Sequence, residues 1–188
     1  MPALILLNGP PASGKSTLAQ RLVDRNPLAL NLDVDVIRSL LGAWIEAPDE
    51  SGLIARRLAL AMATQHLDAG YDVVVPQFLA KVAFIHELES AAAAVRAGFA
   101  EIVLDVDRHD VIEAFGARSV DPQTQTHADA AALVGRSTEP DPLGAAYNDL
   151  QRLVANRPKT IRVPVVADDV ETTLATLLDL LKRTGIDW

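Results

Sequence analysis

The chain has 188 residues, of which 49% are hydrophobic and 4% aromatic, with a formal net charge of −8 and no cysteine. This length predicts one domain over residues 1–188, and the lack of a long apolar run or a signal peptide predicts a cytoplasmic protein without membrane contact. The missing cysteines exclude disulfides and thiolate chemistry, and the negative charge disfavours nucleic acid as a partner, since its binding usually relies on a basic surface.

Apolar runs and the breakers between them predict strands that alternate with helices. The expected strands are 3–7, 29–32, 72–75, 101–104 and 160–163. Helices are expected after the glycine-rich loop that follows the first strand, then at 36–41, 52–67, 82–97, from a cap at Asp107 or Asp110 to about Arg118, and at 145–156 and 170–183. This alternation predicts an α/β fold whose parallel sheet carries helices on both faces. The polar stretch 119–142 is expected to be a mobile lid.

The loop after the first strand carries the most specific motif. Its sequence, Gly9-Pro10-Pro11-Ala12-Ser13-Gly14-Lys15-Ser16-Thr17, fits G-x-x-x-x-G-K-[ST] at every fixed position. Backbone amides and a helix N-terminus in such a loop attract phosphate oxygens. We expect Lys15 to reach the β and γ phosphates and Ser16 to ligate Mg²⁺. The motif predicts a nucleoside triphosphate site, with ATP as the leading candidate and GTP as the alternative, formed by Gly9, Ala12, Ser13, Gly14, Lys15, Ser16 and Thr17.

Two carboxylates, Asp33 and Asp35, follow the second strand at the sheet edge where open α/β proteins bind ligands. Phosphoryl transfer to a hydroxyl uses one carboxylate near the metal and another that orients or deprotonates the acceptor. We therefore expect Asp35 to be the base and Asp33 to hold the hydration shell of the metal. In the alternative, both aspartates only cap the next helix. Arg38, one turn beyond Asp35, is expected either to bind an anionic group of the acceptor or to neutralise Asp35.

The loop, Asp35 and Arg38 stand in the order and spacing of the P-loop kinases. Over residues 3–41 the chain resembles the AAA_33/zeta-toxin-like group and is similar to chloramphenicol phosphotransferases, shikimate kinases and the kinase domain of phage polynucleotide kinases. The resemblance implies a five-stranded parallel sheet with a lid over the nucleotide. It also implies that Asp35 is the base for the acceptor hydroxyl and that Arg38 lies on the substrate side.

The end of the third strand departs from this pattern, because Gln77 stands where many relatives carry an aspartate. Gluconate kinases, which the chain also resembles, lack that aspartate and use a segment similar to 78–81. Gln77 and Lys81 are therefore candidates for substrate binding. The alternatives are a helix-capping glutamine and a solvated lysine.

Several further residues are candidates near the lid and the acceptor site. Arg118 or Arg136 could stabilise charge on the transferring phosphoryl group, with a structural ion pair as the alternative. Arg118 best matches the lid arginine of related kinases, and it is therefore expected to be catalytic and to contact the nucleotide. The adjacent Arg56 and Arg57 could bind an anionic substrate or solvate the outer face of their helix.

The remaining candidates are aromatic or imidazole side chains. Trp44 is expected in the core or on the acceptor pocket. His109 and His127 are expected at the surface.

The leading hypothesis is an ATP- and Mg²⁺-dependent phosphotransferase that acts on a hydroxyl of a small molecule. Asp35 would be its base, and Lys15 and Arg118 would stabilise charge. Two alternatives stay open. One is a 5′-hydroxyl polynucleotide kinase, which the acidic composition disfavours. The other is a nucleotide-dependent switch with little turnover, which the missing third-strand aspartate favours.

Overall fold

Five short strands, rich in Leu, Ile and Val, pair in parallel in the order β2-β3-β1-β4-β5. The computed structural model describes residues 1–188, and its strands are β1 (Ala3–Asn8), β2 (Leu30–Asn31), β3 (Val73–Pro76), β4 (Gly98–Asp105) and β5 (Ile161–Pro164). β1 lies in the middle of the sheet, and all of its residues are buried. A continuous apolar run suits this place because both faces of the sheet are covered.

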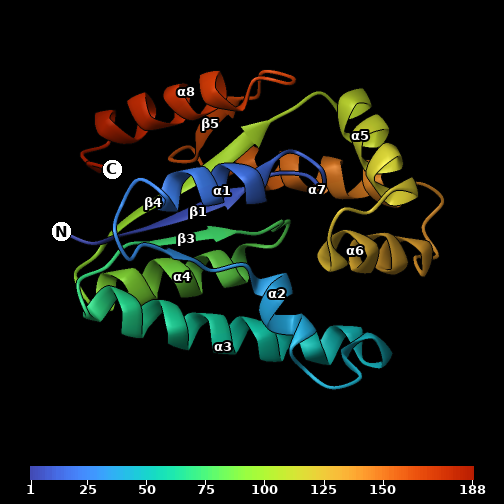
Figure 1. Ribbon diagram of the computed structural model, residues 1–188, viewed down its shortest axis with the longest axis horizontal. Helices are drawn as coiled ribbons and strands as arrows, with labels where there is room; N and C mark the ends of the chain where they lie inside the picture. The colour runs from blue at the N-terminus through green and yellow to red at the C-terminus, as the bar shows by residue number, and fades with distance from the viewer.

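Helices cover the two faces of the sheet (Figure 1). They are α1 (Lys15–Val23), α2 (Val34–Ser39), the short 3-10 helix η1 (Trp44–Glu46), α3 (Pro48–Asp68), α4 (Val82–Ala94), α5 (Arg108–Val120), α6 (Gln125–Gly135), α7 (Pro142–Ala155) and α8 (Val170–Arg183). Leu4 and Leu6 of β1 pack with α3 and α4, whereas Ile5 and Leu7 pack with α1 and α8. The predicted α/β fold with a five-stranded parallel sheet is confirmed. None of the helices is both long and apolar enough to cross a membrane.

The largest difference from the expected elements lies in the stretch 119–142, which contains the helix α6. Thr124 caps this helix by accepting a hydrogen bond from the His127 amide, and the alanines that follow favour helix. α3 and α7 begin at Pro48 and Pro142, earlier than expected, because proline fits the first turn of a helix. α5 and α6 stand at the carboxyl ends of the strands, where α2 also lies (Figure 1).

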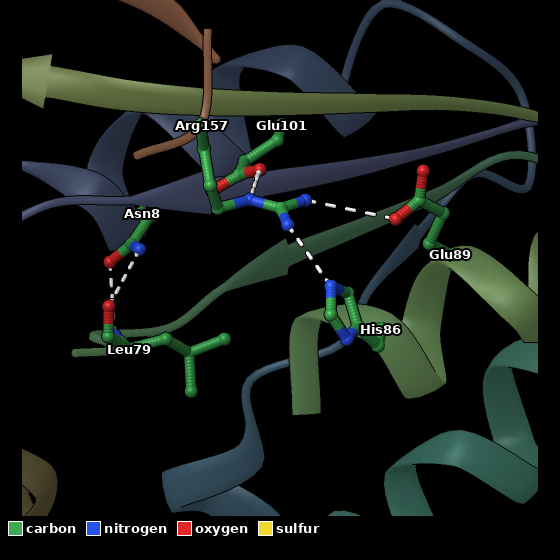
Figure 2. Close-up of polar contacts among 6 residues, drawn as sticks. All are labelled: Asn8, Leu79, His86, Glu89, Glu101 and Arg157. Carbon is green, nitrogen blue, oxygen red and sulfur yellow. Dashed lines mark hydrogen bonds and ion pairs between the residues drawn. The ribbon is translucent and has the colours of Figure 1, made fainter. Parts of the chain in front are cut away.

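One charged cluster is built into the face of the sheet that α4 covers. The side chain of Glu101 on β4 is only 5% exposed and accepts a 2.6 Å hydrogen bond from Nε of Arg157, just after α7. The same guanidinium lies 3.2 Å from Nε2 of His86 and 3.7 Å from the carboxylate of Glu89, both on α4 (Figure 2). The cluster ties α4 to the turn after α7 and neutralises a carboxylate that the sheet buries.

Candidate nucleotide and acceptor site

The glycine-rich loop joins β1 to α1 and is tightly closed. A Cβ on Gly9 would lie 2.7 Å from Oγ of Ser13 and 3.1 Å from Cβ of Leu104, so a larger residue would force the loop apart. Ala12 and Gly14 adopt left-handed backbone angles, with φ of 63° and 85°. No side chain caps the N-terminus of α1, and the buried hydroxyl of Ser13 has no hydrogen-bond partner. Unsatisfied amides at the start of a helix form a site for anions.

Lys15 is the charged centre of this site. Its Nζ donates a 2.8 Å hydrogen bond to the carbonyl of Pro10. Burial, and after it the charge of Arg118, lowers the pKa of Lys15 from 10.5 to about 8, whereas Asp35 and Asp33 act in the opposite direction. The predicted loop lysine, lid arginine and both aspartates therefore lie close enough to act on one another, although they come from α1, α5 and the start of α2.

Asp33 and Asp35 have different surroundings. Oδ1 of Asp33 accepts hydrogen bonds from the amides of Asp35 at 2.9 Å and Val36 at 3.4 Å, so Asp33 caps α2. Burial, and next the charge of Asp35, raises the pKa of Asp33. Asp33 thus caps α2, as the alternative predicts, but it does so with Oδ1 alone. Its Oδ2 makes no hydrogen bond. The Asp35 side chain does not cap the helix; it is exposed in the first turn of α2 and takes part in no ion pair.

Arg38 is held by three contacts that join α2, η1 and α3. Its Nε donates to Oγ of Ser51 at 3.2 Å, a terminal nitrogen donates to the carbonyl of Pro48, and the guanidinium lies 4.8 Å from the ring centre of Trp44. It forms no direct ion pair with Asp35, although both residues line one small cavity. Trp44 is half-buried rather than in the core.

Helix α6 lies next to Asp35, which stays exposed. Asp35, Arg38 and Trp44 line a cavity of about 50 Å³ together with Thr126, Asp129, Ala130 and Leu133 of α6. At the end of this helix Arg136 donates a hydrogen bond to the carbonyl of Ile45 in η1. This contact joins the end of α6 to η1.

Arg118 on α5 lies close enough to His127 on α6 for its charge to act on the imidazole. Arg118 is half-buried, lies over the ring of Phe115 and takes part in no ion pair, so the ion-pair alternative is wrong for it. Burial, and after it the charge of Arg118, lowers the pKa of His127, whose Nδ1 is buried without a partner. His109 is exposed, as expected, whereas His127 on α6 is half-buried, with only its Nδ1 fully covered.

The end of β3 is fixed to the loop by Asn8, a residue that the sequence motifs did not single out. Its Oδ1 accepts a hydrogen bond from the Gly9 amide at 2.8 Å. Figure 2 shows its two contacts with Leu79, in which Oδ1 accepts from the amide at 3.0 Å and Nδ2 donates to the carbonyl at 2.9 Å. Gln77 lies in the same segment, is 8% exposed and has a buried Oε1 without a partner. The sequence does contain a signal for Asn8, because it is a polar residue at the end of an apolar strand, just before the glycine-rich loop.

A groove of about 580 Å³ opens between α3 and the segment that precedes α4. Its charged lining residues are Arg38, Arg56, Lys81 and Asp49. Arg57 lines a separate hollow with Gln65 and Asp68, so the structure separates the two adjacent arginines. Thus Arg38 and Lys81 lie in one groove, whereas Gln77 does not line it.

Comparison with known proteins agrees with this fold. The gluconokinase of Sinorhizobium meliloti 1021 is 18% identical over 98% of this chain and 96% of its own, with a TM-score of 0.57. The tunicamycin resistance protein of Deinococcus radiodurans is 16% identical over 99% and 97%, with a TM-score of 0.59. The APS kinase of Mycobacterium tuberculosis is 18% identical over 96% and 97%, with a TM-score of 0.53.

These structures share the fold of the chain. A comparison with curated protein sequences found no match. A family model described as an AAA domain matches residues 4–135, from β1 through the last residue of α6. The matched stretch includes the glycine-rich loop, both aspartates, Arg118 and the lid helix. The chain therefore belongs to the AAA_33 family and has the P-loop kinase fold.

Proposed function

We propose that the protein transfers the γ-phosphoryl group of ATP to a hydroxyl group of a small molecule. The observation that carries this proposal is the convergence of Lys15, Arg118, Asp33 and Asp35, whose charges act on one another at the end of the glycine-rich loop. Asp35 is the one carboxylate of this group that is neither a cap nor part of an ion pair. It is therefore available to a hydroxyl group in the cavity beneath α6.

The loop itself supports a triphosphate as the donor. The uncapped start of α1 and the buried, unpartnered Ser13 hydroxyl offer hydrogen-bond donors to anionic oxygens. Lys15 adds a positive charge that burial disfavours. Negatively charged phosphate oxygens nearby would raise its pKa back toward its ordinary value. Mg²⁺, for which Ser16 and the second oxygen of Asp33 are the oxygen donors at hand, neutralises phosphate charge when it is bound.

In this proposal Asp35 accepts the proton of the acceptor hydroxyl. The hydroxyl oxygen forms a bond to the γ-phosphorus, and the bond from that phosphorus to the bridging oxygen of ADP breaks. Lys15 and Arg118 stabilise the charge that gathers on the transferring group and on ADP. α6 covers one side of this cavity and would limit the access of water, which favours the acceptor hydroxyl as the group that takes the phosphoryl group.

Transfer of label from γ-labelled ATP tests the proposal. The panel contains sugars, sugar acids, nucleosides, hydroxylated antibiotics and 5′-hydroxyl oligonucleotides. Asp35→Asn is expected to lower transfer by about 10²- to 10⁴-fold, because it removes a general base, while nucleotide affinity stays within a few-fold. The exposed Asp68→Asn, on α3 outside the site, is the control and should behave as wild type. Full transfer by Asp35→Asn would refute the assignment of the base, and tight ATP binding without any labelled acceptor would favour a nucleotide-dependent switch.

A further inference from the structure

The groove beside α3 gathers three cationic side chains that no carboxylate neutralises. Arg38, Arg56 and Lys81 line it, and none of them belongs to any of the nine ion pairs of the molecule. Asp49 is the one acidic residue on the groove. The chain as a whole has a net charge of −8, so this groove is opposite in sign to the rest of the protein. Such a local reversal favours anionic ligands.

We infer that the acceptor carries an anionic group, a carboxylate or a phosphate, which binds between Arg56 and Lys81. This inference rests on the proposed kinase function and adds the chemical class of the acceptor. Arg56 lies with its guanidinium 5.7 Å from the ring centre of Phe84, which holds the planar group against the groove wall. Lys81 stands directly before α4 on the other side and is exposed. The pair offers a planar donor and a mobile ammonium to one anion.

The rest of the lining indicates a small molecule with a carbon skeleton. Leu53, Phe78, Leu79 and Phe84 contribute apolar walls, and the volume of about 580 Å³ is within the usual range for small-ligand pockets. A longer polyanion would leave the groove and meet an acidic surface. A hydroxylated acid or phosphate ester therefore fits the groove better than a nucleic-acid strand.

Arg38 connects this groove to the proposed reaction centre, because it lines both the groove and the small cavity that contains Asp35. Two of its nitrogens are engaged by Ser51 and Pro48, so its position is set by the fold. An acceptor whose anionic end lies between Arg56 and Lys81 would pass Arg38 and present its hydroxyl toward Asp35. The same arrangement explains why the two neighbouring arginines of α3 differ, since Arg57 faces another hollow.

Initial transfer rates with matched acceptor pairs test this inference. The pairs are D-gluconate with D-glucitol, D-glycerate with glycerol, and glycerol phosphate with glycerol, so that carboxylate and phosphate are examined separately. We expect only anionic members to be phosphorylated. Arg56→Gln and Lys81→Gln should each raise KM about 10- to 100-fold with little change in kcat, because each removes a charge-assisted hydrogen bond from bound acceptor.

The matched control is Arg57→Gln, which removes the same charge from the next residue. It should change KM by no more than about twofold. Added salt should raise KM for an anionic acceptor through screening. Equal effects of Arg56→Gln and Arg57→Gln would overturn the inference, as would preferred phosphorylation of the neutral members or of a 5′-hydroxyl oligonucleotide.

Calorimetry separates this inference from the proposed function. D-gluconate, D-glycerate and glycerol phosphate are titrated into protein saturated with a non-hydrolysable ATP analogue and Mg²⁺. Anion binding that Arg56→Gln weakens and Arg57→Gln spares would support the groove even if no transfer occurred. Asp35-dependent transfer to a neutral alcohol would leave the kinase function intact and refute the anionic acceptor. Absence of both binding and transfer for every anion would also refute it.

Discussion

Replacing Lys15 with methionine is expected to stabilise the nucleotide-free protein although it removes a central residue of the proposed site. A pKa of about 8 in place of 10.5 means that the protonated side chain costs about 3 kcal/mol more in the folded protein than in the unfolded chain. The substitution removes this cost and also the hydrogen bond to Pro10, which contributes about 1 kcal/mol. We expect the free energy of unfolding to rise by about 2 kcal/mol at neutral pH.

The difference between Lys15→Met and wild type should depend on pH in a defined direction. Below pH 8 the lysine is protonated in both the folded and the unfolded state, so wild type carries the full cost of the buried charge. Between pH 8 and 10.5 the unfolded chain binds a proton that the folded protein does not. The stability of wild type therefore rises with pH relative to the variant, by about 1.4 kcal/mol per pH unit in this window.

Urea unfolding followed by circular dichroism, at neutral pH and again above pH 9, measures this difference. Lys182→Met, on the exposed end of α8, serves as the control and should show no such pH dependence. A Lys15→Met variant that is less stable than wild type at neutral pH, or a gain that does not shrink as the pH rises, would refute the reasoning. A non-hydrolysable ATP analogue with Mg²⁺ should stabilise wild type alone, since the variant lacks the phosphate contact.

Three other substitutions probe the remaining features. Arg157→Met should lower the free energy of unfolding by about 3–5 kcal/mol in urea titrations, because it leaves the buried carboxylate of Glu101 without a partner. Arg136→Ala releases α6 from the carbonyl of Ile45, and we expect ADP production without acceptor to rise because water can enter the cavity. Gln77→Asp puts a carboxylate where a buried amide oxygen lacks a partner, and it should lower the Mg²⁺ concentration needed for half-maximal nucleotide binding.

Each of these substitutions has an internal check. Arg152→Met breaks an exposed ion pair with Asp149 and should cost less than about 1 kcal/mol, so a similar loss in Arg152→Met and Arg157→Met would contradict the role of burial. Unchanged ADP production in Arg136→Ala would mean that the contact with η1 does not hold the lid. Gln77→Asn keeps an amide without adding a charge. If it changed the Mg²⁺ concentration for half-maximal nucleotide binding as much as Gln77→Asp does, the effect would come from the shape of the side chain and not from its charge.

The parts of the fold that could be predicted from sequence are those in which local pattern and burial agree. β1 and the glycine-rich loop were recognisable because a buried parallel strand and a phosphate-binding loop have strict residue requirements. Helix α6 was missed because its polar neighbours outweighed the cap at Thr124 and the alanines after it. The same omission hid the partial burial of His127, whose Nδ1 is covered in this helix.

The acceptor groove depends on contacts between residues distant in sequence. Whether Arg56 or Arg57 faces it follows from the rotation of α3, whose buried stripe is Ser51, Ala55, Ala59, Ala63 and Leu67. The spacing of four residues in that stripe indicates which side of α3 is buried, and hence which arginine faces the groove. Only the packing of α3 beside α4, however, brings Arg56 and Lys81 to one groove. The contacts of Asn8 with Leu79 likewise required the pairing of β1 with β3.

The amide of Asn8 gives the protein a direct mechanical link between its two proposed binding regions. One side chain holds the first amide of the glycine-rich loop and both backbone groups of Leu79, whose side chain lines the acceptor groove. If bound phosphate displaces the loop, these three hydrogen bonds would carry the displacement to the groove wall. Each ligand should then alter the affinity for the other by the same factor, since linkage between two sites is reciprocal. A single polar residue at the end of an apolar strand would thereby make cooperative binding of donor and acceptor a property of the fold.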